Sequence, residues 1–96
     1  MRRYWTDPKN VEEIINRTQT GFLPIVSGLP GFATYSALDV GDGNLVTLSG
    51  FDNAARADES VRAAAAWVKS SLGPLLPNGP IVTSGDVRFL VLANST

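Results

Sequence analysis

The sequence contains no cysteine and no histidine among its 96 residues. Without cysteine, a disulfide scaffold and thiol chemistry are excluded. Without histidine, the chain lacks the commonest metal ligand and the commonest general base. We therefore expect neither a bound metal nor a cofactor, and no catalytic residue is assigned from the sequence.

The sequence also lacks a clear excess of either charge, since it has eight lysines and arginines and nine acidic residues, for a formal net charge of −1. Proteins that bind nucleic acid usually carry a basic surplus on one face, so we expect no nucleic-acid partner. No apolar run approaches the roughly 18 residues of a membrane span. The polar start "MRRYWTDPKN" lacks the apolar core of a signal peptide, which favours a cytoplasmic protein with no membrane partner.

The remaining composition, 44% hydrophobic and 18% charged, is that of a globular protein, and the length fits a single domain over residues 1–96. Hydrophobic periodicity and turn residues predict strands at residues 2–6, 32–40, 45–51 and 81–92, the last interrupted by Gly85, and helices at residues 11–26 and 52–72. This order predicts an α+β protein of the ferredoxin-like βαββαβ type. Such a protein has a four-stranded antiparallel sheet with both helices on one face.

Local signals refine the two helices. Asn10 is the predicted N-cap of the first helix, and either Asp52 or Asn53 that of the second. Gly21 and Pro24 lie inside the first helical pattern. Because proline lacks the amide that an interior helical turn needs, they predict a kink or a restart there.

The glycine-rich segment Gly-Asp-Gly-Asn at residues 41–44 separates two predicted strands. It lacks the phosphate-loop pattern, and a strand follows where a phosphate site would need a helix N-terminus. It is also too short for a calcium loop. Glycines between two alternating runs are typical of a hairpin turn, which is our prediction.

The predicted strands carry large apolar side chains on both faces. Residues 45–51 place Leu45 and Phe51 on one face, and Val46 and Leu48 on the other; residues 87–92 show a similar mixture. The face of such a sheet that points away from the helices is normally polar, because water covers it. A second copy of the chain is the simplest cover for an apolar face, so we expect a homodimer.

Three side chains are candidate ligand-binding residues because of their chemical character and their place in the predicted elements. Trp67 lies among small residues, off the main apolar stripe of the second helix. It would either border a cavity between helix and sheet or fill the core or the dimer interface. Tyr35 is a strand aromatic with the same alternatives. Arg3 would hold an acidic ligand if its side chain faced inward, and would be solvated if it faced outward.

Several segments resemble one known superfamily: "RRYWTDP", "FLPIVSGLPGFATYSALDVGDGNLVTLSGFD", "AARADESVRAAAAWV" and "VTSGDVRFLVLA". They look like the dimeric α+β barrels, and are most similar to small members related to the antibiotic biosynthesis monooxygenase domain. The resemblance implies two ferredoxin-like units whose sheets pack face to face. It also implies Asn16, Trp67, Tyr35 and Arg3 as candidate ligand-binding residues.

Three functions follow as hypotheses. The resemblance implies a cofactor-independent monooxygenase-like enzyme acting on an aromatic or polyketide-like substrate. The alternatives are a non-catalytic dimer that binds a small apolar or aromatic ligand, and a structural or stress-related dimer whose cavity is filled. Haem degradation, which relatives perform with a histidine on iron, is not expected of a chain without histidine.

Overall fold

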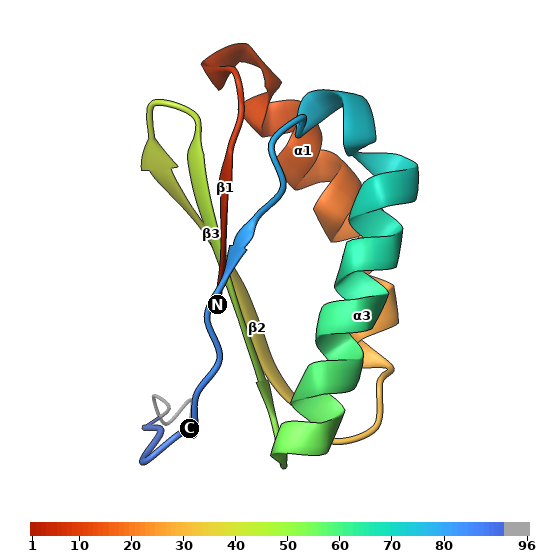
Figure 1. Ribbon diagram of the computed structural model, residues 1–96, viewed down its shortest axis with the longest axis vertical. Coiled ribbons are helices and arrows are strands. Elements are labelled where there is room, and N and C mark those ends of the chain that lie inside the picture. The colour runs from red at the N-terminus through yellow and green to blue at the C-terminus, as the bar shows by residue number, and fades with distance from the viewer. Residues whose placement is uncertain (92–96) are drawn as a thin grey trace, which may run out of the picture.

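A four-stranded antiparallel sheet carries the helices on one face (Figure 1). The computed structural model describes residues 1–91. The strands follow the spatial order β2-β3-β1-β4, and their bounds are β1 (Arg2–Trp5), β2 (Phe32–Gly41), β3 (Asn44–Phe51) and β4 (Ile81–Val82). Each of the three pairings is antiparallel. The predicted α+β architecture is thereby confirmed, and its strand order is compatible with a ferredoxin-like fold.

The first helical region consists of four consecutive pieces: η1 (Pro8–Asn10), α1 (Val11–Arg17), the π-helical turn η2 (Thr18–Phe22) and α2 (Leu23–Ser27). The predicted irregularity is confirmed, because the π-turn lies at Gly21 and Pro24 stands in the first turn of α2. The predicted cap at Asn10 is wrong. Asp7 instead starts the helical region by accepting a hydrogen bond of 3.1 Å from the Lys9 amide, and Asn10 makes no capping bond.

The second long helix is α3 (Ala54–Ser71), followed by the short turn η3 (Gly73–Leu75). Asn53 caps α3, since its side chain accepts a 2.9 Å hydrogen bond from the Arg56 amide. The alanine-rich middle favours helix and presents little bulk. These small side chains allow α3 to lie against the sheet alongside α1 (Figure 1).

The segment between β2 and β3 is a tight turn, as predicted. Asp42 and Gly43 both have positive φ, at 56° and 82°, which is the combination that a two-residue hairpin turn requires. Asn44 closes the turn by donating from its side chain to the Gly41 carbonyl at 3.0 Å. A side chain at Gly43 would collide with the Thr6 carbonyl, so glycine is needed there for space as well.

The predicted last strand, residues 81–92, is mostly wrong. Only Ile81 and Val82 form strand, and residues 83–91 are exposed and irregular; Leu92 lies outside the described residues. β4 pairs with β1 through Arg2 and Arg3, and the pairing ends where the Thr83 amide donates to the Met1 carbonyl. In the described part of the chain, no strand pairs with residues 84–91. Side chains with high strand propensity are not sufficient for a strand, because its backbone N–H and C=O groups also need partners on a neighbouring strand.

Two clusters of buried side chains fill the space between sheet and helices. The larger one consists of Tyr4, Val11, Ile14, Leu45, Leu72 and Leu76. The smaller one consists of Phe22, Val26 and Ala64, and Trp67 packs against both clusters. The opposite face of the sheet leaves large apolar side chains exposed, among them Trp5, Leu38, Leu48 and Ile81. Within residues 1–91, no helix combines the length and apolar character that crossing a membrane requires.

Candidate functional site

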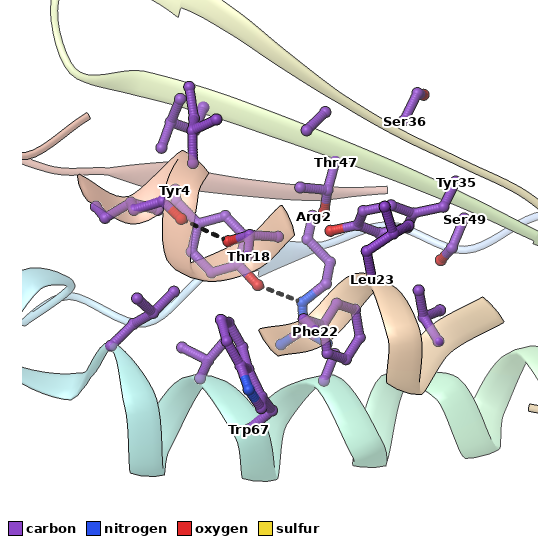
Figure 2. A pocket seen from close by; sticks show the side chains of 18 of the residues that line it. Arg2, Tyr4, Thr18, Phe22, Leu23, Tyr35, Ser36, Thr47, Ser49 and Trp67 are labelled. Atoms are coloured by element: carbon purple, nitrogen blue, oxygen red, sulfur yellow. Dashed lines mark hydrogen bonds between the residues drawn. The ribbon is translucent and has the colours of Figure 1, made fainter. Parts of the chain in front are cut away.

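A cavity of about 330 Å³ lies between the sheet and the helices (Figure 2). Its wall is mainly apolar and aromatic, with contributions from β1, β2, β3, the α1–η2–α2 region and α3. The side chains that define it are Arg2, Tyr4, Phe22, Tyr35, Trp67 and Leu72. An apolar hollow with few polar groups is the usual form of a small-molecule site.

The aromatic end of the cavity depends on the π-turn η2. This turn directs Phe22 toward α3 and β2, so that its ring centroid lies 5.4 Å from that of Trp67 and 5.7 Å from that of Tyr35. A Cβ added at Gly21 would lie 3.0 Å from Cζ2 of Trp67, so glycine allows the indole to approach the backbone. Inserted π-turns of this kind are frequent at functional sites.

Arg2 provides the charge of the site. β1 alternates in burial, which places Arg2 and Tyr4 on the inner face of the sheet and Arg3 and Trp5 on the outer face. Arg2 is only 8% exposed. Its Nε donates to the Tyr4 hydroxyl at 2.7 Å (Figure 2). One terminal nitrogen donates to the Val61 carbonyl of α3 at 3.1 Å.

The two tyrosines are held in their neutral form. Burial raises the pKa of Tyr4, while the charge of Arg2 and its hydrogen bond act in the opposite direction. Burial also raises the pKa of Tyr35, and interaction with the Thr47 side chain opposes this. The Tyr4 hydroxyl accepts from Arg2, which leaves its own hydrogen available as a donor. The charged Arg2 and the two neutral tyrosines therefore contribute hydrogen-bonding groups to a mainly apolar cavity.

In the part of the chain that the structure describes, Arg2 forms no ion pair with an acidic side chain. Within residues 1–91 the ion pairs join Lys9 to Asp7, Arg17 to Glu13 and Arg56 to Asp52, all with exposed partners. The same residues contain no group of three or more acidic side chains placed to hold a metal ion. The cavity thus has a net positive end whose protein partners are neutral oxygens.

The structure brings together two of the four candidate residues. Trp67 and Tyr35 both line the cavity, and Trp67 lies on the buried side of α3 rather than off its apolar face. Arg3 points to the outer face, where its guanidinium carbon lies 5.7 Å from the Trp5 ring centroid. Asn16 is exposed on α1, and neither Arg3 nor Asn16 lines the cavity.

Arg2 and Tyr4 are the site residues that were missed from the sequence. The alternation in "RRYW" shows that they share a face, but either face of a strand is compatible with that pattern. The pairing of Tyr4 with the buried Leu45 would have identified the inner face. No family model, curated protein or solved structure matches the chain.

Proposed function

We propose that this protein binds a small aromatic or largely apolar molecule in the cavity between the sheet and the helices. The observation that supports this most directly is the cavity itself, about 330 Å³ and bordered by Phe22, Tyr35 and Trp67. Aromatic rings arranged around a hollow can stack on a flat ligand and exclude water from it. A filled cavity, as in a purely structural dimer, would leave no such space.

Binding of a fluorescent aromatic probe tests this function. Trp67→Phe should weaken binding, because it removes part of the aromatic wall, and should do so without unfolding the protein. Trp5→Phe is the matched control, since Trp5 lies on the outer face of the sheet. Equal weakening by both variants, or no saturable binding by the native protein, would contradict the proposed site.

A second candidate is cofactor-independent oxidation, and the group of Arg2, Tyr4 and Tyr35 favours it. These donors can stabilise the oxyanion of an ionised phenol or enol, the electron-rich form that reacts with oxygen. In the balanced reaction, an activated methylene and O₂ give a carbonyl and water. Oxygen uptake with anthrone, a phenol tautomer with such a methylene, tests it. The rate above the spontaneous reaction should fall in Trp67→Phe but not in Trp5→Phe.

We also propose that two copies assemble through the outer faces of their sheets, as in a dimeric α+β barrel. The support is the exposed apolar surface on that face, which includes Leu38, Leu48 and Ile81. Native mass spectrometry should find two chains. Leu48→Glu should yield monomers, whereas Ile25→Glu should not, because Ile25 is equally exposed at 44% but lies on α2, away from the sheet face. A monomeric native protein would refute this assembly.

A further inference from the structure

Arg2 is a buried charge in need of a partner. It is the one buried charged side chain among residues 1–91, with 8% exposure. Removing a guanidinium from water is costly unless an opposite charge or several good acceptors replace the lost hydration. The acceptors that the protein supplies are a neutral tyrosine hydroxyl and a main-chain carbonyl. This compensation is incomplete.

The unused hydrogen-bonding capacity of Arg2 belongs to the cavity. Two of its N–H groups donate to Tyr4 and Val61, and the others have no acceptor among residues 1–91. Among the described residues, every fully buried side-chain nitrogen has a hydrogen-bond partner. A nitrogen of Arg2 that has no partner is therefore in contact with open space. Arg2 is a lining residue of the cavity, so we infer that its remaining N–H groups have access to the space where a ligand would lie.

The surroundings of Arg2 favour an anion. Its titratable neighbours in the cavity are Tyr4, Tyr35 and the amino group of Met1. Burial raises the pKa of both tyrosines, and an amino group is never anionic, so none of the three supplies a negative charge. A guanidinium binds a carboxylate through two parallel N–H groups and is less strongly hydrated than an ammonium. The rest of the wall is mainly apolar and aromatic, with uncharged polar side chains such as Thr18 and Thr47, and suits the body of an organic molecule.

We propose that the ligand is an aromatic carboxylate, whose acidic group binds Arg2 and whose ring lies among Phe22, Tyr35 and Trp67. This rests on the proposed binding function and specifies the chemical class of its ligand. Tyr4 positions the guanidinium by accepting from Nε, and its own hydroxyl hydrogen adds a donor beside the carboxylate.

A matched pair of probes tests the charge requirement, because 2-naphthoate and 2-naphthamide have nearly the same shape and differ in charge. By isothermal titration calorimetry at pH 7, the native protein should bind the carboxylate about ten- to a hundred-fold more tightly. Arg2→Met should abolish this preference. Arg3→Met, the neighbouring change on the outer face, should retain it.

The outcomes separate this inference from the function on which it rests. Equal binding of both probes by the native protein overturns the anion preference and leaves aromatic binding in place. Binding of neither probe overturns both. A preference that persists in Arg2→Met overturns the assignment to Arg2. The comparison in the native protein needs no variant, and Arg2→Lys, which keeps the charge but not the planar fork, should give an intermediate preference.

Discussion

Replacing Arg2 with methionine in the ligand-free protein tests whether the arginine serves the ligand or the fold. Methionine keeps an unbranched apolar stem of similar reach and removes the charge together with both hydrogen bonds. If Arg2 mainly holds β1 to α3 through the Val61 carbonyl, its removal should lower the free energy of unfolding. If Arg2 mainly binds an anion, its removal should weaken ligand binding and leave the free energy of unfolding nearly unchanged.

The expected magnitude follows from two opposing terms. The variant loses two hydrogen bonds from a charged donor, each contributing about 1.5–3 kcal/mol. It also no longer buries a guanidinium without an opposite charge, a relief of several kcal/mol. The terms nearly cancel, so the free energy of unfolding of Arg2→Met should lie within about 1 kcal/mol of the native value. Breaking a well-compensated buried pair would instead cost about 3–5 kcal/mol.

Urea denaturation followed by circular dichroism measures this free energy, provided that all proteins are compared at one concentration and have similar m-values. Arg3→Met is the control, and at a concentration at which the protein is monomeric it should change stability by less than about 0.5 kcal/mol, because Arg3 is then exposed. A loss of about 3 kcal/mol or more in Arg2→Met, with Arg3→Met unaffected, would refute the reasoning. Arg2 would then be a structural anchor, and its burial would no longer indicate an anionic ligand.

Three further predictions concern the elements around the site. Asn53→Ala should lower the free energy of unfolding by about 1 kcal/mol in urea denaturation, because it removes the cap of α3; Asn10→Ala, which removes no capping bond, should be nearly neutral, and equal losses would contradict this. Gly21→Ala should displace the neighbouring indole into the cavity and weaken aromatic-probe binding, whereas Gly73→Ala, with open space at its Cβ, should not. Burial raises the pKa of Tyr35, so above about pH 10 the unfolded chain binds fewer protons and stability should fall as pH rises. That decline, measured by urea denaturation at a series of pH values, should be smaller in Tyr35→Phe, and an unchanged slope would contradict the burial effect.

Elements whose signals are local were predictable from the sequence. The hairpin turn needs positive φ at its two central residues, and the glycine-rich segment at residues 41–44 predicted such a turn. The π-turn lies where a glycine and a proline interrupt the helical pattern. The cap at Asn10 failed because two capping residues compete. Asp7 precedes a proline that suits a first helical turn, so the helical region begins earlier than the periodicity indicates.

The last strand failed for a non-local reason. Residues 87–91 are rich in strand-forming side chains, but a strand also needs a neighbour to accept and donate its backbone hydrogen bonds. β1 supplies that neighbour for Ile81 and Val82, and the last hydrogen bond of the pairing runs from the Thr83 amide to the Met1 carbonyl. Sequence periodicity reports which faces are apolar and carries no information on where the partner strand ends.

The cavity shows the same division between local and non-local information. Trp67 and Tyr35 could be named in advance because bulky aromatics amid small or alternating residues are visible in the sequence. The choice between Arg2 and Arg3 was not visible, since β1 places one arginine and one aromatic residue on each face. Pairing decides it: Arg2 lies opposite Thr47 on β3, and both side chains line the cavity. A slip of one residue would exchange the two arginines and leave the cavity with Arg3 and Trp5 instead. The charge of the site is therefore a consequence of strand register. Arg2→Met should abolish the preference for 2-naphthoate over 2-naphthamide and Arg3→Met should retain it, so this pair of variants tests the register in solution.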